Sequence, residues 1–336
     1  MTGARKLLTR ADLEPLAHAA MGPACRLTAV TRLRGGSKKG VYRLTFDDRR
    51  TAIAYVWSPD EDYWNGGAGE PDPRDPFSHA SGIDLFTAAH DRLADLGVRT
   101  PRLLLADRTG RHLPADATVV EDVRGGTLEE ALHRGPEGPA TATLERLAEA
   151  LEAMRAHATH AFGKVSVVDA GGTSHGTSCA QVVRDRALLD IAEAAGRDAR
   201  IAGAREALDE RIRTLASAVR PRDHHTLIHG ELGPDHVLID TDGHPVLIDI
   251  EGLMYFDPEW EHVFLELRFG PHYDVLRTPG PALDEDRLRL YRLAIRLSLV
   301  AGPLRLLDGD FPDREFMRDI AEHNLQQALS LLRNAS

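Results

Sequence analysis

The chain has 336 residues, a formal net charge of −11 and 42% hydrophobic residues, which is enough apolar material for a sizeable core. This acidic balance argues against nucleic acid as the main partner, because phosphate binding requires a basic surface. No apolar run long enough for a membrane span and no signal-peptide core occurs, so we expect a cytoplasmic protein without membrane contact. The only cysteines, Cys25 and Cys179, predict neither a disulfide framework nor a cysteine metal site.

The first part of the chain predicts a short helix followed by an antiparallel sheet. Residues 13–20 have helical spacing, with Asp12 as the candidate N-cap. Alternating patterns between residues 26 and 57 then predict three strands, in RLTAVTRL, VYRLTF and TAIAYVW. The later elements expected in this part are a helix over residues 83–96 and strands over residues 102–106 and 117–121.

The candidate phosphate-binding loop is the turn between the first two strands, Gly35-Gly36-Ser37-Lys38-Lys39-Gly40. Its glycines allow the backbone to close over a nucleotide, and its serine and two lysines offer hydrogen-bond donors. Because short glycine motifs are common, a flexible and solvated hairpin tip is the alternative interpretation.

Residues 58–81 are rich in proline, glycine and aspartate, and we expect no core from them. They predict a surface insertion that is either disordered or a functional flap. Three aromatic residues, Tyr63, Trp64 and Phe77, favour a role as a flap or docking segment.

The second half of the chain is predicted to be mainly helical around one short sheet-forming stretch. The expected helices cover residues 127–133, 140–159, 177–195, 202–218, 259–268, 284–301 and 312–332. Between them, residues 225–260 read HTLIHGELGPDHVLIDTDGHPVLIDIEGLMYFDPEW. This stretch predicts a buried strand, a polar loop and then two strands over residues 237–239 and 246–250.

The polar loop carries His229, Glu231 and His236, and the last strand leads to Asp249 and Glu251. An acid on a loop, followed by another acid at the end of an apolar strand, is how phosphoryl transferases place a base beside a metal. A carboxylate at the end of an apolar strand is costly unless a cation binds it, so Asp249 is the main candidate ligand for Mg²⁺.

Two neighbours of Asp249 are further candidate ligands. Glu251 is two residues farther on, and we expect it on the same strand face, where it supplies a second oxygen. The imidazole of His236 suits Mn²⁺ or zinc better than Mg²⁺. Three interpretations stay open: a second metal is absent, the preferred metal differs, or His236 donates a hydrogen bond to phosphate.

The order His-Gly-acid, Val-Leu-Ile, Val-Leu-Ile-Asp-x-Glu and Asp-Pro within residues 225–260 resembles the aminoglycoside phosphotransferase family. These are bacterial small-molecule kinases with a protein-kinase-like fold. The resemblance implies an α+β, bilobal protein, with a nucleotide in the cleft. Residues 1–124 would form a small antiparallel-sheet lobe that binds nucleotide and carries the flexible insertion, and residues 125–336 a larger, mainly helical lobe for catalysis and substrate binding.

The resemblance also implies roles for single residues. Glu231 takes the place of the family's catalytic aspartate, which orients the substrate hydroxyl as base, and His229 supports the metal-binding segment. His236 takes the place of the family's metal-binding asparagine. The backbone C=O of Glu121 and N–H of Val123 correspond to the hinge that binds adenine.

One family feature is missing from its usual place. The third strand of such folds carries a phosphate-binding lysine that pairs with a helix glutamate, whereas this chain has Tyr55 there and no glutamate in the next helix. Losing both charges together avoids an unpaired buried charge. We therefore expect Lys38 or Lys39 to contact phosphate from the turn.

The function implied is transfer of the γ-phosphate of ATP or GTP, with Mg²⁺ or Mn²⁺, to a hydroxyl of a small molecule such as an aminoglycoside-like antibiotic or a metabolite. An acidic surface suits a cationic substrate, and Glu261 and Glu266 are candidates for an acidic wall on the substrate side. Two alternatives stay open: a pseudokinase that binds nucleotide without transferring phosphate, and a protein that sequesters a small molecule.

Overall fold

The structure is a computed structural model that describes residues 5–34, 36–64, 72–135, 139–277 and 282–333. It has the predicted α+β class, with an antiparallel sheet early in the chain and mostly helices later. The chain forms two compact units. Unit 1 comprises Met1–Pro71, His79–Leu147 and Pro234–Glu251, and unit 2 comprises Asp72–Ser78, Ala148–Gly233 and Gly252–Ser336. By this grouping residues 125–147 belong with the sheet of unit 1, and a lobe boundary after residue 124 stays a prediction.

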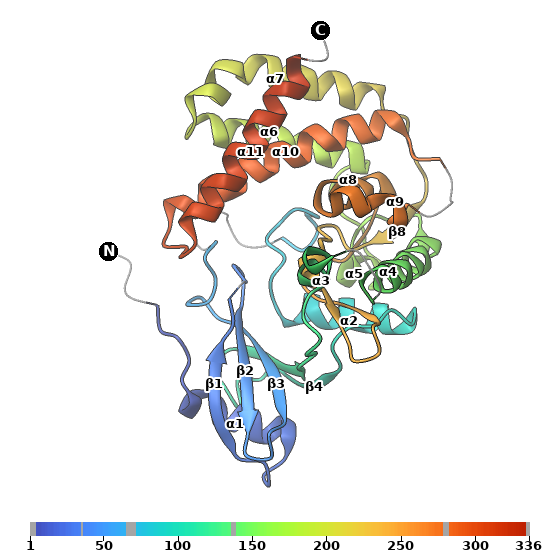
Figure 1. The fold of residues 1–336 in the computed structure, drawn as a ribbon. Helices are drawn as coiled ribbons and strands as arrows, with labels where there is room; N and C mark the ends of the chain where they lie inside the picture. Colours follow the sequence, from blue (N-terminus) through green and yellow to red (C-terminus); the bar gives the residue numbers. More distant parts are fainter. Residues whose placement is uncertain (1–4, 35, 65–71, 136–138, 278–281, 334–336) are drawn as a thin grey trace. The chain divides into compact units, whose positions relative to one another are not determined.

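Unit 1 is built on a five-stranded antiparallel sheet (Figure 1). In spatial order its strands are β1 (Leu27–Arg32), β2 (Gly40–Phe46), β3 (Thr51–Trp57), β5 (Asp116–Glu121) and β4 (Leu103–Asp107). These are the five strands that the alternating patterns predict. Side chains of β2 alternate between buried and half-buried, since one face of the sheet packs on a core and the other is partly open.

Helix α1 (Arg10–Met21) covers one face of this sheet, with Leu13 and Leu16 fully buried in its core. Its N-cap is Thr9, so the prediction of Asp12 as N-cap is wrong. Thr9 and Asp12 instead form a capping box, in which each side chain bonds the other residue's backbone N–H. The reason is that Asp12 stands three residues after a threonine, the spacing a capping box requires.

Strand β3 is buried on both faces, because helix α2 (Ile83–Asp95) lies against its second face. The rings of Tyr55 and Trp57 pack on Phe86 of α2, with centroids 5.6 and 5.8 Å away. The strand therefore reads as a continuous apolar run and not as an alternation.

Unit 1 also contains a β-hairpin from much later in the chain. Its strands are β9 (Val237–Ile239) and β10 (Pro245–Leu247), preceded by the 3-10 turn η1 (Pro234–His236). Beside it lie α3 (Leu128–Arg134) and the first half of α4 (Pro139–Ala156). A side chain at Gly125 would meet the carbonyl oxygen of Ile239 at 2.1 Å, so only glycine allows the two segments to approach this closely.

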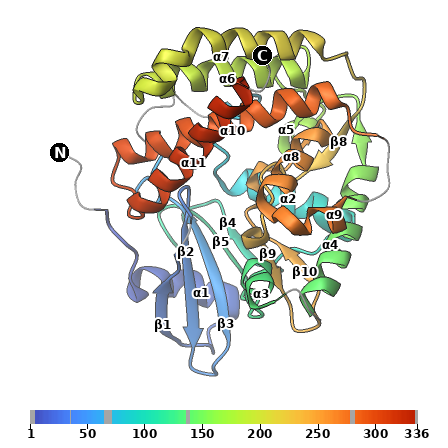
Figure 2. The same cartoon turned by 45° about the horizontal axis from the view of Figure 1, so that its top comes forward.

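Unit 2 combines a small sheet with a helical core. The sheet order is β6 (Ala158–Thr159), β8 (His225–Ile228), β11 (Met254–Phe256) and β7 (Gly163–Lys164). The helices are α5 (Val165–Val168), α6 (Cys179–Ala195), α7 (Ala199–Ala218), α8 (Pro258–Phe269), α9 (Tyr273–Leu276), α10 (Glu285–Asp308) and α11 (Arg314–Arg333). Figure 2 shows α6, α7, α10 and α11 layered together, and α6 and α10 contribute many of the core side chains.

The described parts of the insertion over residues 58–81 have no helix or strand. One part nevertheless packs within unit 1, and another part packs within unit 2. Glu61 is fully buried in unit 1, and the ring of Phe77 lies 4.9 Å from that of Trp260 within the core region of unit 2. The expectation that the segment contributes nothing to a core is therefore wrong. Among the described residues, no helix is long and apolar enough to cross a membrane.

Candidate active site

The insertion holds the glycine-rich turn of unit 1 in place. The backbone N–H of Tyr63 donates to the carbonyl of Ser37 at 2.8 Å, and the indole N–H of Trp64 donates to its hydroxyl oxygen at 2.8 Å. On the other side, the hydroxyl of Ser81 donates to the carbonyl of Lys38 at 3.1 Å. A serine that accepts a hydrogen bond can still donate its own proton, so Ser37 stays a candidate phosphate donor. Gly36 has a φ of 78°, and the predicted site residue Gly35 lies outside the described residues.

Lys39 follows at the start of β2 and points its ammonium group at two carboxylates. Its Nζ lies 2.9 Å from Oδ1 of Asp249 and 2.5 Å from Oε1 of Glu251. Its side chain is only 8% exposed. Burial alone would lower the pKa of Lys39, but the two carboxylates outweigh burial and hold this pKa well above its usual range. Lys39 is therefore a charged ammonium that is itself nearly buried, whereas its partner Asp249 is half-exposed.

The missing lysine of the third strand has a spatial replacement. Val41 pairs with Tyr55 in the sheet, so Lys39 reaches the ring of Tyr55 from the neighbouring strand. The ammonium lies 5.2 Å from the ring centroid, within the range of a cation–π contact. The partner glutamate is likewise replaced, since Glu251 and not a residue of α2 pairs with this lysine.

Asp249 and Glu251 reach Lys39 through a change of backbone direction. Strand β10 ends at Leu247, Asp249 has a φ of 58°, and Glu251 lies in the 3-10 turn η2 (Ile250–Gly252). The expectation that both acids share one strand face is wrong, because the strand ends before either of them. Aspartate tolerates the left-handed backbone conformation better than most residues. At Asp249 this conformation turns the carboxylates of Asp249 and Glu251 toward the ammonium group of Lys39.

The carboxylates of Asp249 and Glu251 suit a divalent cation as well as the ammonium group of Lys39. Glu251 is 5% exposed, and within the described part of the chain its Oε2 has no hydrogen-bond partner. A buried carboxylate oxygen without a partner is costly, and a bound cation offsets that cost. Carboxylate oxygens are the ligands that Mg²⁺ and Mn²⁺ prefer. The pKa of Asp249 is held well below its usual range, first by Lys39, so its carboxylate is ionised and able to bind metal.

His236 lies at the other oxygen of Asp249. Its Nε2 is 3.9 Å from Oδ2 of Asp249 and 3.7 Å from Asp235. Asp249 therefore lies near His236, and it shares the ammonium group of Lys39 with Glu251. The groups of described residues whose ligand atoms all lie within 4.8 Å of one another are elsewhere, at Cys179-His225-Asp257 and Asp240-Asp242-His244.

The predicted hinge residues occupy the end of β5 and the chain just after it. The carboxylate of Glu121 pairs with Arg99 at 3.0 Å and accepts the backbone N–H of Arg102 at 3.2 Å. Val123 is buried. Adenine binding by their backbone groups stays a prediction.

Unit 2 carries the predicted catalytic loop, which begins where β8 ends. His229 is buried, whereas Glu231 is exposed to solvent. Gly230 lies between them and has a φ of 94°. Its backbone N–H and its backbone C=O both bond to side chains of α8. Its N–H donates to Oε2 of Glu261 at 2.7 Å, and its C=O accepts the indole N–H of Trp260 at 2.9 Å. This helix therefore sets the conformation of the residue that precedes Glu231.

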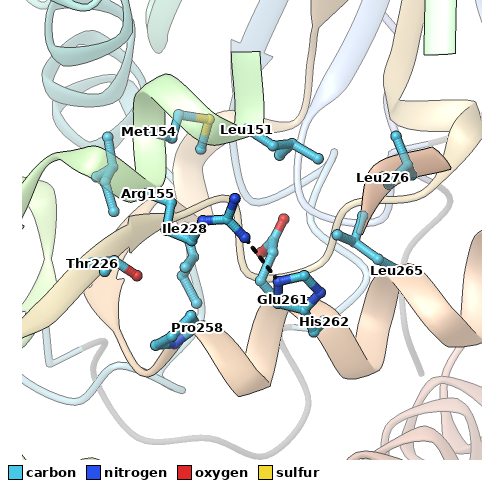
Figure 3. A pocket seen from close by; sticks show the side chains of 11 residues that line it. Leu151, Met154, Arg155, Thr226, Ile228, Pro258, Glu261, His262, Leu265 and Leu276 are labelled. Carbon is cyan, nitrogen blue, oxygen red and sulfur yellow. Dashed lines mark hydrogen bonds between the residues drawn. The ribbon is translucent and has the colours of Figure 1, made fainter. Parts of the chain in front are cut away.

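Glu261 does not line a substrate-facing wall, so that expectation is wrong. It is 5% exposed and lies beside His262 in a mostly apolar pocket of unit 2 (Figure 3). Burial raises the pKa of Glu261 to about 7, although the backbone N–H groups of Gly230 and His229 act against this rise. The burial of Glu261 could have been predicted from the sequence, because this glutamate directly follows a tryptophan on the buried side of an apolar helix.

His262 is the second polar residue of this pocket. Its Nε2 lies 3.3 Å from a guanidinium nitrogen of Arg155, and its Nδ1 lies 3.0 Å from the hydroxyl of Tyr273. Burial lowers the pKa of His262 to about 4, and the charge of Arg155 adds to this effect. The imidazole is therefore neutral near pH 7 and bridges α4, α8 and α9.

Asp257, at the N-cap of α8, anchors a buried ionic network. It accepts hydrogen bonds from Arg287 at 2.8 Å and from the hydroxyl of Tyr291 at 2.5 Å. Burial would raise the pKa of Asp257, but His225 and the two arginines, Arg222 and Arg287, lower it to about 2. The Asp-Pro motif therefore has a structural role, because Asp257 connects the start of α8 to α10. Sequence reasoning missed this role.

Comparisons with known proteins agree with this geometry. The model of the phosphotransferase enzyme family (APH) matches residues 29–298. No curated protein sequence matches the chain.

Three solved structures illustrate the likeness of the fold. Spectinomycin phosphotransferase APH(9)-Ia, in complex with ADP and spectinomycin, has a TM-score of 0.65 and 10% identity, covering 97% of this chain and 99% of that chain. Choline kinase LicA from Streptococcus pneumoniae has a TM-score of 0.60 and 13% identity, with 96% and 99% covered. A thermostable mutant of aminoglycoside phosphotransferase APH(4)-Ia, apo form, has a TM-score of 0.59 and 16% identity, with 90% and 95% covered. The fold is thus the protein-kinase-like fold.

Proposed function

Because the chain belongs to the phosphotransferase enzyme family, we propose that it transfers the terminal phosphoryl group of ATP or GTP to a hydroxyl of a small organic molecule. One observation carries the proposal. Lys39 lies far from Asp249 and Glu251 in the sequence, yet the three side chains converge within unit 1, where Lys39 and Glu251 are nearly buried and Asp249 is half-exposed. Phosphoryl transfer depends mainly on positioning and on stabilising charge, and this cluster supplies both.

Within unit 1, Asp249 and Glu251 are the residues that would hold a divalent cation, Mg²⁺ or Mn²⁺. When bound, such an ion neutralises charge on the phosphate oxygens. The ammonium of Lys39, fixed at the same carboxylates, is positioned to stabilise phosphate charge as well. The glycine-rich turn, with the hydroxyl of Ser37, covers the phosphates.

Glu231 of unit 2 is the proposed base. Its carboxylate accepts the proton of the substrate hydroxyl as the hydroxyl oxygen bonds to the γ-phosphorus, while the bond from this phosphorus to the bridging oxygen breaks and the nucleoside diphosphate leaves. Trp260 and Glu261 hold the peptide of Gly230, and so limit the positions that the neighbouring Glu231 can take. Glutamate is one methylene longer than the family's aspartate, and this fixed loop is what keeps the longer side chain in a productive place.

The proposed acceptor is an amine-bearing alcohol, because a chain with a net charge of −11 attracts cations. The names of similar structures, spectinomycin phosphotransferase and choline kinase, fit this class of substrate. A panel of aminoglycosides, spectinomycin and amino alcohols is therefore the first set to test for phosphate transfer.

The experiment that tests the function is titration calorimetry with ATP and with GTP, in Mg²⁺ and then in Mn²⁺. We expect metal-dependent binding to the wild-type protein and its loss in Asp249→Ala, since this change removes the main metal carboxylate. The matched control is Asp91→Ala, an exposed acid on α2, which should bind as the wild type does. Failure of the wild type to bind any nucleotide would overturn the proposal.

Binding alone does not separate a kinase from a pseudokinase. Release of ADP in the presence of one of the panel substrates, with phosphate found on that substrate by mass spectrometry, would establish transfer. Tight nucleotide binding without any transfer across the panel would favour the pseudokinase alternative.

A further inference from the structure

We propose that the ammonium group of Lys39 is a built-in cation between Asp249 and Glu251, and that the protein therefore binds its nucleotide with one divalent ion and not two. This inference rests on the proposed function. Protein kinases hold two Mg²⁺ ions, one at an aspartate after a strand and one at an asparagine of the catalytic loop. In this chain Asp249 keeps the first position, where Lys39 contacts it, and His236 takes the place of the asparagine at the second.

The first support is the geometry of Lys39. Its Nζ bridges Oδ1 of Asp249 at 2.9 Å and Oε1 of Glu251 at 2.5 Å. A divalent ion would occupy the same kind of position between two carboxylates. Since Lys39 is 8% exposed, solvent does not compete for its charge.

The second support is the fixed position of the turn that carries Lys39. Both preceding residues are held by the insertion, Ser37 by Tyr63 and Trp64, and Lys38 by Ser81. The following residue, Gly40, has no room for a side chain, because a Cβ there would lie 2.5 Å from the carboxyl carbon of Glu61. Lys39 is thus anchored on both sides.

The third support is the charge count. The two carboxylates carry two negative charges and Lys39 carries one positive charge, so the cluster retains one negative charge. Within the described residues, Oε2 of Glu251 is a buried oxygen of this cluster that has no hydrogen-bond partner. One divalent ion satisfies this oxygen, whereas a second ion would have to be placed beside an ammonium group and an imidazole.

The test counts metal ions. Wild-type protein saturated with β,γ-imido-ATP is titrated with Mn²⁺, and free Mn²⁺ is followed by electron paramagnetic resonance. We expect one bound Mn²⁺ per nucleotide-bound protein. Lys39→Met removes the ammonium while keeping a side chain of similar length, and we expect two bound Mn²⁺ ions in this variant. Lys38→Met removes the neighbouring positive charge from the same turn and should still bind one.

The outcomes separate the two proposals. Two Mn²⁺ ions in the wild type, or one in Lys39→Met, would overturn the built-in cation and leave the proposed function standing. Absence of β,γ-imido-ATP binding to the wild type would overturn both.

A second measurement does not depend on nucleotide. Without Lys39 the two carboxylates repel each other, so Mn²⁺ alone should raise the melting temperature of Lys39→Met more than that of the wild type or of Lys38→Met. An equal rise in all three proteins would count against the inference. If Lys39→Met does not fold, the wild-type ion count decides.

Discussion

At the scale of single residues, Lys39 supplies a positive charge beside Tyr55, which lies on the neighbouring strand. The third strand carries a tyrosine where related kinases carry lysine, and the neighbouring strand begins just after a lysine whose ammonium lies 5.2 Å from that ring. Adjacent strands are close enough for a long side chain to reach across. Lys39 therefore brings a positive charge next to the strand position at which related kinases carry their lysine.

The proposed base gives a residue-scale prediction. Glu231→Gln removes the proton acceptor but keeps the size of the side chain, so we expect kcat to fall by about 10²–10⁴-fold while nucleotide binding is unchanged. Glu231→Asp keeps a carboxylate and should retain more activity than Glu231→Gln. Steady-state kinetics with the best substrate of the panel, together with calorimetry, checks both. Equal kcat in Glu231→Gln and wild type would assign the base elsewhere.

Glu261 gives a prediction about pH and stability. Burial raises the pKa of its carboxyl group to about 7 in the folded protein, from an ordinary value of 4.5. Between these two pH values the unfolded chain releases a proton that the folded chain keeps, so the free energy of unfolding falls as pH rises through this window. The expected loss between about pH 5 and about pH 8 is about 2–3 kcal/mol.

The variant Glu261→Gln tests this assignment. An amide does not titrate, so urea unfolding of this variant should lose the fall in stability that the wild type shows over the same pH range. Glu266→Gln, which changes a half-exposed carboxylate on the same helix, serves as the control and should keep the wild-type dependence. The same pH dependence in Glu261→Gln and wild type would show that other groups cause it.

At the scale of elements, the insertion acts as a brace for the glycine-rich turn. Trp64 donates its indole N–H to the hydroxyl of Ser37 across a separation of 27 residues. Glu61 supports the base of the same turn from the buried side, where it pairs with Arg32 at 2.7 Å. A segment without helix or strand thus fixes a loop through a few specific contacts.

A double-mutant cycle measures this brace. Trp64→Phe removes this hydrogen bond, worth about 1 kcal/mol, so it should weaken nucleotide binding about fivefold; Ser37→Ala removes the same bond and the proposed phosphate donor, so it should weaken binding more. The two changes together should cost little more than Ser37→Ala alone, because Trp64→Phe then has no bond left to remove. Fully additive losses in calorimetry would mean that the indole and the hydroxyl act independently.

At the scale of the whole molecule, stability depends on the buried network around Asp257. Arg287 of α10 bonds both Asp257 and the backbone carbonyl of Arg220, and so joins α10 to the chain on either side of β8. We expect Arg287→Leu to lower the free energy of unfolding by about 3–5 kcal/mol, because it leaves a buried carboxylate without this partner. Arg289→Leu, on an exposed face of the same helix, should cost less than about 0.5 kcal/mol. Urea denaturation of the two variants checks the contrast.

Most of the fold could be predicted, because it depends on local patterns. Short apolar and alternating runs predicted the strands of the five-stranded sheet, and helical spacing predicted α2, α6 and α10 to within a few residues of their ends, apart from the C-terminus of α10. The candidate acids Asp249 and Glu251 were also found, since their types and spacing match a known chemistry. The pairing of Lys39 with both of them could not be found, because 210 residues separate Lys39 from Asp249 and no sequence pattern encodes such a contact.

That separation has a consequence for how the protein is made. Translation proceeds at about 5–20 residues per second, so about 10–40 s pass between the synthesis of Lys39 and that of Asp249. During this interval the N-terminal sheet lacks the β9–β10 hairpin that belongs to the same compact unit. Unit 1 is therefore incomplete until about three quarters of these 336 residues have been made, and the proposed phosphate-binding cluster cannot form before then.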